Sequence, residues 1–106
     1  MNLRPRDLRT PFVLQRKVKG PKDQYGQPTE EWVEQFAGYC LIRPLTAKEA
    51  YYAGGVKEGT AFRIFMRYRD DVRVKDRLVL ADGRIVNLTS VADYEYRHQW
   101  LDCQGA

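Results

Sequence analysis

The chain has 106 residues, a formal net charge of +4 at pH 7, one histidine and two cysteines. This length fits one domain, and no apolar run approaches the roughly 20 residues needed to cross a bilayer. The first residues lack the apolar stretch of a signal peptide, so we expect a cytoplasm-like compartment. With His98 as the one histidine and no Cys-x-x-Cys pair, we expect no enzyme, cofactor or metal site. Cys40 and Cys103 should be reduced and buried in strands.

A basic arm and a strand are the first predicted elements. Residues 1–11 combine arginines with prolines, which predicts an extended arm that is either disordered or docked on a neighbour. From Phe12 to Lys19 apolar and polar residues alternate as in a half-buried strand, and Gly20-Pro21 should end it. The polar, turn-rich segment 20–30 then predicts a long projecting loop.

A long strand and a short helix come next. The second strand is predicted from Glu31 to Ile42, with Gly38 as the site of a bulge or a barrel corner. Thr46 and Glu49 form the capping-box pattern that is typical of a helix start. We therefore expect a short helix over about residues 47–53.

The C-terminal half predicts more strands. Thr60 to Arg69 alternates most regularly, with Arg63, Arg67 and Arg69 mostly opposite the apolar side chains. Asp82-Gly83 is the residue pair favoured by a two-residue type I′ hairpin. A second hairpin should turn through the polar residues 95–98. The remaining predicted strands are 77–81, 84–88, 90–94 and 99–103.

Short antiparallel strands in a small chain manage their edges by closing into a barrel or a sandwich. The sequence therefore predicts a mainly β fold: a small antiparallel β-barrel of about six strands with a long loop and one short helix. We divide the chain into an N-terminal arm, residues 1–11, and one barrel domain, residues 12–106. The loop 20–30 and the helical segment 46–59 should project from that domain.

Exposed tyrosines and arginines are the candidate contact residues. The loop is either a solvated connector or a contact arm anchored by Tyr25. The arginines of strand 60–69 are either a solvated sheet face or a grip for carboxylates or DNA phosphates. Thr46 and Glu49 serve most simply as the helix start. Tyr51 and Tyr52 are adjacent on the predicted helix, so their side chains point about 100° apart and cannot both be buried, which makes an exposed tyrosine available for an interface. The candidate interface set is Asp23, Gln24, Tyr25, Gly26, Gln27, Glu49, Tyr51, Tyr52, Arg63, Arg67 and Arg69, with Arg4, Arg6 and Arg9 in the N-terminal arm, residues 1–11.

Several of these motifs occur together, in the order and spacing of a known family. They are the Leu14-Gln15-Arg16 strand, the Asp23-Gln24-Tyr25-Gly26-Gln27 loop with Trp32, Ile42-Arg43-Pro44 leading to Lys48-Glu49, Arg67-Tyr68-Arg69, Asp82-Gly83-Arg84-Ile85 and Leu101-Asp102-Cys103. The chain thereby resembles the head-tail joining proteins of long-tailed bacteriophages, also called head-tail adaptor, head-completion or stopper proteins. The Tyr94-Glu95-Tyr96 segment is richer in tyrosine than this pattern.

The resemblance implies a structural protein of the virion neck that is assembled in the cytoplasm of the bacterial host. It implies a ring, with twelve copies as the expected number, that binds below the phage portal directly or through another adaptor ring. Such a ring retains the packaged DNA and offers a platform to tail proteins. No membrane partner is implied. Ring contacts of this kind are heterologous, so each copy needs two complementary faces.

A different class of function stays open at the level of the sequence. Tyrosines and arginines on a small basic barrel could also bind single-stranded nucleic acid, with bases stacked on the rings. The modest charge of +4 favours this alternative less than the structural one.

Overall fold

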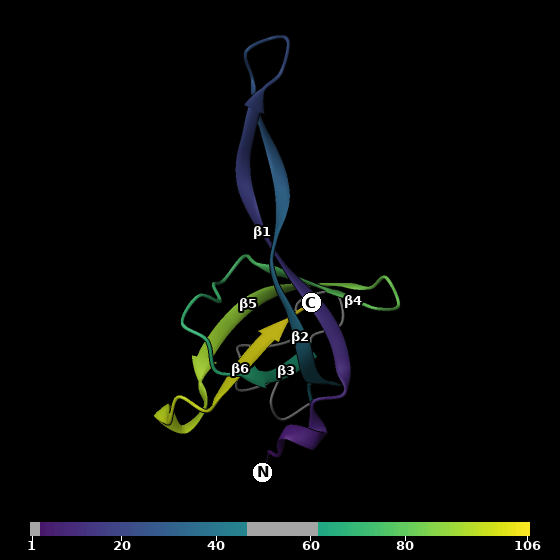
Figure 1. Ribbon diagram of the computed structural model, residues 1–106, viewed down its shortest axis with the longest axis vertical. Helices are drawn as coiled ribbons and strands as arrows, with labels where there is room; N and C mark the ends of the chain where they lie inside the picture. Colours follow the sequence, from purple (N-terminus) through teal and green to yellow (C-terminus); the bar gives the residue numbers. More distant parts are fainter. Residues whose placement is uncertain (1–2, 47–61) are drawn as a thin grey trace.

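A computed structural model describes residues 3–46 and 62–106 of the chain. Its six strands form one closed antiparallel barrel in the order β1-β2-β3-β6-β5-β4, with β4 pairing back onto β1 (Figure 1). The predicted antiparallel barrel is therefore confirmed. The strands are β1 (Thr10–Lys22), β2 (Pro28–Pro44), β3 (Phe62–Arg67), β4 (Arg77–Leu80), β5 (Ile85–Asp93) and β6 (Trp100–Gly105), and short 3-10 turns lie at Pro5–Asp7 (η1) and Tyr94–Tyr96 (η2).

Side chains that alternate along the strands fill the barrel. Ile64 and Met66 of β3, for example, are 0% and 2% exposed, whereas Arg63 and Arg67 point to the outer side. Burial of such apolar surface is the main force that holds a small barrel together. The core consists of Phe12, Leu14, Cys40, Ile64, Met66, Val72, Leu78, Leu80, Val86, Leu88, Leu101 and Cys103.

Both cysteines lie in this core, as predicted. Cys40 and Cys103 are free thiols with no exposed surface. Burial raises the pKa of each thiol to about 12, because the thiolate would lose its hydration. Both side chains are therefore neutral and act as small apolar groups in the core.

The hairpin of β1 and β2 extends far beyond the barrel and gives the molecule a long axis of 52 Å against 29 and 28 Å (Figure 1). The expected end of the first strand at Gly20-Pro21 is wrong, because β1 continues to Lys22 and β2 begins at Pro28. Gly20 and Pro21 together face Thr29 in a register irregularity, and the Thr29 hydroxyl donates a hydrogen bond to the Pro21 carbonyl. A Cβ at Gly20 would lie 2.7 Å from the Thr29 oxygen, so glycine permits this close pairing.

The bulge in β2 lies at Gln35 and not at Gly38. Leu14 faces Phe36 and Gln15 faces Glu34, which leaves Gln35 as the extra residue. The Gln35 amide donates to the Val33 carbonyl at 3.2 Å. Gly38 instead pairs in regular register with Phe12.

The hairpin between β4 and β5 has three loop residues, so the predicted two-residue type I′ turn is wrong. The Leu80 N–H donates to the Arg84 carbonyl, and the Gly83 N–H donates to the Leu80 carbonyl, both at 2.9 Å. Gly83 has a φ of 91°, while Asp82 is not among the residues with positive φ. This pattern is a type I turn followed by a left-handed glycine.

Other predicted boundaries changed as well. The segments 84–88 and 90–94 belong to one strand, β5, whose register shifts between Leu88 and Ser90. The N-terminal segment is not fully extended, because η1 forms a 3-10 turn and β1 begins at Thr10. The predicted helix over residues 47–53 lies outside the described residues.

Candidate interaction surface

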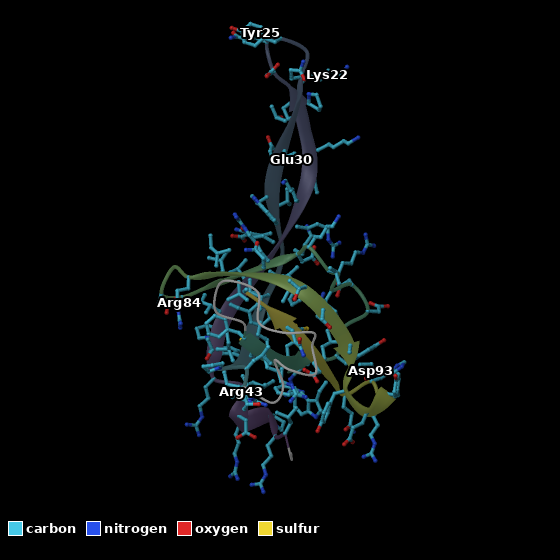
Figure 2. All side chains as sticks on the ribbon, turned by 180° about the vertical axis from the view of Figure 1, so that it is seen from behind. Lys22, Tyr25, Glu30, Arg43, Arg84 and Asp93 are labelled. Atoms are coloured by element: carbon cyan, nitrogen blue, oxygen red, sulfur yellow. The ribbon has the colours of Figure 1, made fainter. Side chains whose placement is uncertain are left out.

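We call residues 16–33 the arm, because they form the part of the β1–β2 hairpin that leaves the barrel. The pairing of β1 with β4 ends at Gln15 and Arg77, so from Arg16 onward β1 has β2 as its one strand neighbour in the described chain. Figure 2 shows Lys22 and Glu30 along the arm and Tyr25 at its far end. Among the described residues, the arm is thus a two-stranded ribbon with two open edges.

The arm ends in a hydrogen-bonded turn, whereas the sequence predicted a long projecting loop over residues 20–30. The Asp23 N–H donates to the Gln27 carbonyl at 2.9 Å, and the Gly26 N–H donates to the Asp23 carbonyl at 3.0 Å. One carboxylate oxygen of Asp23 accepts from the N–H groups of Tyr25 and Gln27, at 2.9 Å each. Gly26 has a φ of 75°, and Tyr25 is 80% exposed. The structure thus brings the candidates 23–27 together in one turn that displays a tyrosine ring.

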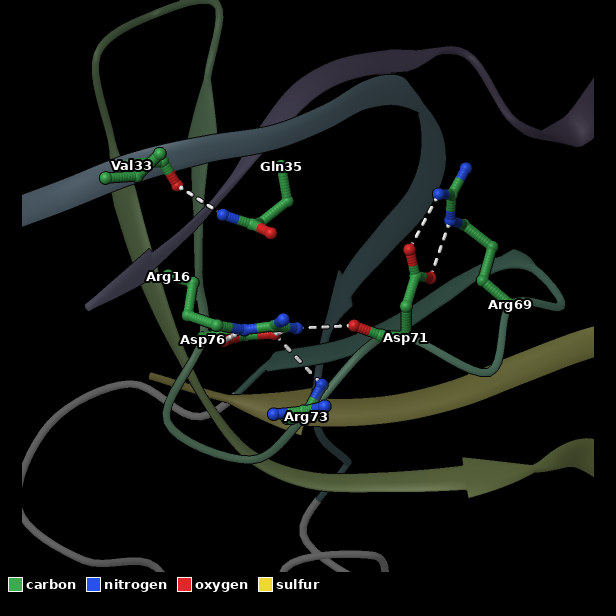
Figure 3. A network of polar contacts seen from close by, with 7 residues as sticks. All are labelled: Arg16, Val33, Gln35, Arg69, Asp71, Arg73 and Asp76. Carbon is green, nitrogen blue, oxygen red and sulfur yellow. Dashed lines mark hydrogen bonds and ion pairs between the residues drawn. The ribbon is translucent and has the colours of Figure 1, made fainter. Parts of the chain in front are cut away.

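A partly buried ion pair fixes one face of the arm at its base (Figure 3). The Arg16 guanidinium donates to both carboxylate oxygens of Asp76, at 3.0 and 2.9 Å, and also to the Asp71 carbonyl. Asp76 is 2% exposed and accepts from the Arg73 N–H at 2.9 Å. The bond to Asp76 raises the pKa of Arg16. Arg16 therefore stays charged and ties β1, where it leaves the barrel, to the segment between β3 and β4.

Trp32 fixes the other face of the arm base. It faces Lys17 in the β1–β2 register, and the Arg77 guanidinium lies 4.0 Å from the centre of the indole ring. Arg77 also donates to the Gln15 side chain at 2.8 Å. Trp32 and Trp100 are both half-buried, and neither belongs to the core cluster. Contacts on both faces indicate that the arm keeps a fixed direction relative to the barrel.

The two strands of the arm carry opposite charges. Lys17 of β1 and Glu30 of β2 form an exposed ion pair with 2.6 Å between Nζ and Oε2. We call the two strand segments of the arm, residues 16–22 and 28–33, the stem. Every charged side chain of the stem follows this division, with cations on β1 and carboxylates on β2. The basic strand carries Arg16, Lys17, Lys19 and Lys22, and the acidic strand carries Glu30, Glu31 and, just beyond the arm base, Glu34.

The arginines predicted to form a stripe on β3 have different surroundings. Arg63 makes a two-pronged ion pair with Asp102 of β6, at 3.0 and 2.7 Å, and lies over the Phe65 ring at 4.8 Å. Phe65 is 0% exposed although it alternates with the inward-facing residues, and its ring also packs edge-on against Tyr94. Arg63 therefore joins two strands within the chain and covers an apolar side chain.

The other two arginines of this set, Arg67 and Arg69, have surroundings that differ from each other. Arg69 binds both carboxylate oxygens of Asp71 at 2.8 Å and stacks over the Phe36 ring at 3.8 Å. Arg67 is exposed and lies 5.9 Å from the Trp100 ring. The structure thus separates the three arginines: Arg63 and Arg69 are paired with carboxylates of the same chain, and Arg67 is exposed beside Trp100. Their role at an interface stays a prediction.

The N-terminal arginines surround η1 at the base of the barrel. The Arg4 N–H donates to Asp7 Oδ2 at 3.0 Å, and the Arg9 Nε donates to the Arg6 carbonyl at 3.1 Å. Leu8 is 9% exposed and anchors the segment. The side chains of Arg4, Arg6 and Arg9 are exposed, so they remain candidates for docking.

The turn between β5 and β6 holds a feature that the sequence did not indicate. His98 stacks on Tyr68 with 4.5 Å between ring centres, and its Nε2 lies 3.2 Å from Asp93 Oδ2. The residues Glu95, Tyr96 and His98 have φ values of 56°, which places Tyr96 at the outside of the turn with 91% exposure.

Three candidates cannot be placed, because Glu49, Tyr51 and Tyr52 lie outside the described residues. Within the ranges 3–46 and 62–106, no group of three His, Cys, Asp or Glu side chains is arranged to hold a metal ion. No helix in the described part of the chain is long and apolar enough to cross a membrane.

Sequence reasoning missed two parts of this surface. Arg16 lies on the predicted strand from Phe12 to Lys19, but Asp76, its partner, is 60 positions away and could not be paired with it from the sequence. The opposite charges of the arm strands were readable, since lysines precede the turn and glutamates follow it. That signal required knowing that residues 16–22 and 28–34 pair as strands.

Comparisons with known proteins agree with this fold and with the resemblance in the sequence. The model of the phage head completion protein family matches residues 3–104. The chain belongs to this family. A search of curated proteins finds no match.

Two solved structures share the fold of this head completion family member. The solution structure of a protein from Shigella flexneri 2a is 24% identical, with a TM-score of 0.76 over 92% of this chain and 90% of that one. A chain of the virion of a native gene transfer agent particle is 19% identical, with a TM-score of 0.69 over 96% of this chain and 94% of that one.

Proposed function

We propose that the chain is a structural subunit of the phage neck that completes the head. Copies form a ring below the portal, retain the packaged DNA and provide the platform for the tail. Membership of the head completion family carries this proposal. The similarity to a chain of a virion particle supports the same location.

The shape of the molecule supports a role in fitting and sealing, without catalysis. The buried core of the closed barrel stabilises the fold without side chains from the arm, so the arm can make contacts with other proteins. The exposed Tyr25 ring on an ordered turn is a suitable anchor, because a rigid aromatic side chain loses little conformational freedom on binding. The arm tip is therefore the proposed contact with another neck component.

DNA-filled heads that lack this protein provide the test. Purified protein is added to the heads, tails follow, and infectious particles are counted. We expect the natural chain to restore infectivity and Tyr25→Ser to lower it by about tenfold or more, because an aromatic anchor often contributes more than 2 kcal/mol to binding.

Tyr96→Ser is the matched control, since it removes an exposed tyrosine from a different turn. Full activity of Tyr25→Ser would remove the arm tip from the contact. Oligonucleotide binding by the natural chain that weakens steeply with salt, without any rescue of heads, would favour the alternative of a nucleic-acid-binding barrel.

A further inference from the structure

The arm presents two open strand edges on opposite sides. Within residues 3–46 and 62–106, residues 16–22 of β1 pair with β2 alone, and β2 pairs with β3 only from Cys40 onward. Open edges expose backbone N–H and C=O groups that can pair with another strand, and proteins usually cover or blunt them. The barrel itself is closed, so the two edges of the arm, one on β1 and one on β2, are the strand edges to which another strand could pair.

Charge makes these two edges complementary to each other. The β1 edge carries three lysines beyond Arg16 and no carboxylate, whereas the β2 edge carries three glutamates and no cation. Two β1 edges, or two β2 edges, would repel each other, whereas a β1 edge and a β2 edge would attract. This arrangement disfavours a two-fold dimer and favours head-to-tail contacts, which is the contact type that closes into a ring.

We propose that the arms of neighbouring copies pair edge to edge, the basic β1 edge of one copy against the acidic β2 edge of the next. In a ring whose arms point the same way along the axis, β1 runs toward the tip and β2 runs back. The contact between copies is then antiparallel and continues the alternation within each arm. The occupant of each open edge is a second copy of this chain. This inference rests on the proposed ring function.

Contacts within the described part of one copy engage only some of the charges of the arm. The Lys17–Glu30 pair is the one ion pair of the stem within the described residues, apart from that of Arg16. Its side chains are 49% and 61% exposed, so it contributes little to the stability of one copy. Lys19, Lys22 and Glu31 remain available on the two edges. Nucleic acid is a poorer occupant, because the acidic strand lies next to the basic one and would repel phosphates.

Charge reversal on one edge at a time tests the pairing. One variant carries Lys17→Glu, Lys19→Glu and Lys22→Glu, so both of its edges are acidic. The other carries Glu30→Lys, Glu31→Lys and Glu34→Lys, so both of its edges are basic. Each variant alone should form rings on isolated portals about tenfold less than the natural chain, as counted by electron microscopy.

The decisive measurement mixes the two variants in equal amounts. An acidic-edged copy next to a basic-edged copy restores every contact between copies, although each copy keeps the repulsion within its own arm. We therefore expect the mixture to recover most of the ring formation of the natural chain, as a ring that contains both variants by native mass spectrometry. Urea unfolding of each variant should match that of the natural chain, since the arm stem lies outside the core.

The failures can be told apart. Rings of the natural chain without rescue by the mixture would overturn the edge pairing and leave the proposed function standing. A variant with all six charges reversed that forms rings, while the mixture does not, would show that the charges act within one arm. A natural chain that forms no rings on portals would overturn the proposed function and the pairing together.

Discussion

The same strand, β1, belongs to the barrel in its first half and to the arm in its second half. In the barrel half, Phe12 and Leu14 have neighbours on both sides, β2 and β4, and are 4% and 0% exposed. In the arm half, Val18 continues the alternation but is 36% exposed, because β4 no longer lies beside it. Alternation alone therefore does not define burial. A second strand neighbour does.

This comparison predicts two levels of stability in one molecule. The barrel should open only in global unfolding, whereas the arm beyond the Arg16–Asp76 pair can open locally, because few of its side chains are buried. Substitutions in the barrel should change the free energy of global unfolding, and substitutions of the same kind in the arm should leave it nearly unchanged.

Truncation of a side chain in each half of β1 should show the largest difference. Leu14→Ala creates a cavity in the core and should lower the free energy of unfolding by about 3 kcal/mol. Val18→Ala should lower it by less than about 0.5 kcal/mol, because the side chain is already partly exposed. Urea unfolding followed by circular dichroism measures both values. Equal losses would show that the arm and the barrel unfold as one unit.

The ion pair at the boundary should have the next largest effect. Asp76→Ala removes the buried partner of Arg16 and the acceptor of the Arg73 N–H. We expect a loss of about 2 kcal/mol, below that for a fully buried pair because the Arg16 side chain is 20% exposed. Amide hydrogen exchange should also rise in the arm more than in β6. Unchanged exchange in the arm would mean that the pair does not fix it to the barrel.

The two glycine turns offer a matched pair of substitutions. Gly26 and Gly83 occupy the same position in two hairpins of the same type, and a Cβ at either would meet no other atom within 4 Å. Their φ values of 75° and 91° make alanine unfavourable by about 1 kcal/mol at each turn. Gly83→Ala should lower the free energy of unfolding by that amount, whereas Gly26→Ala should only loosen the arm tip. A larger global effect at Gly26 would contradict the division.

The smallest effect should appear in acid. Hydrogen bonds from Arg69 lower the pKa of Asp71 below its usual value. The folded state thus binds this proton less readily than the unfolded state, so the pair stabilises the fold above about pH 4, and that contribution is lost as the pH falls further. Both side chains are 44% exposed, so Asp71→Asn should cost less than about 1 kcal/mol at pH 7 and close to nothing at about pH 2.5. Urea unfolding at the two pH values measures the difference.

The barrel followed from sequence alternation because each strand buries one face against a shared core. The strand Phe62–Arg67 shows this, since the spacing placed Arg63 and Arg67 opposite the apolar side chains, and Ile64 and Met66 are buried. The bulge at Gln35 was not predictable, because a register shift depends on which residues face each other across two strands. The arm was hidden for a similar reason. Gly20 and Pro21 are typical strand ends, and the pairing of Lys22 with Pro28 in the structure shows that the ladder continues past them.

The candidate contacts were predictable in proportion to how local they are. Residues 23–27 form one turn through hydrogen bonds within five positions of sequence, so they were found together. Arg63 was found as an exposed-face residue, but its partner could not be identified, because Asp102 lies on another strand. The partner of Arg69 is only two positions away, at Asp71, but proximity in sequence alone does not show that the two side chains pair.

The sealed thiols of Cys40 and Cys103 make the natural sequence a convenient host for labels. Thiols with a pKa near 12 and no exposed surface react too slowly to compete with a cysteine newly placed on the arm. A fluorophore or spin label attached at Lys19→Cys would therefore report on a single position, without removal of either native cysteine. Distances between arms on neighbouring copies could then be followed during assembly in an otherwise unaltered chain.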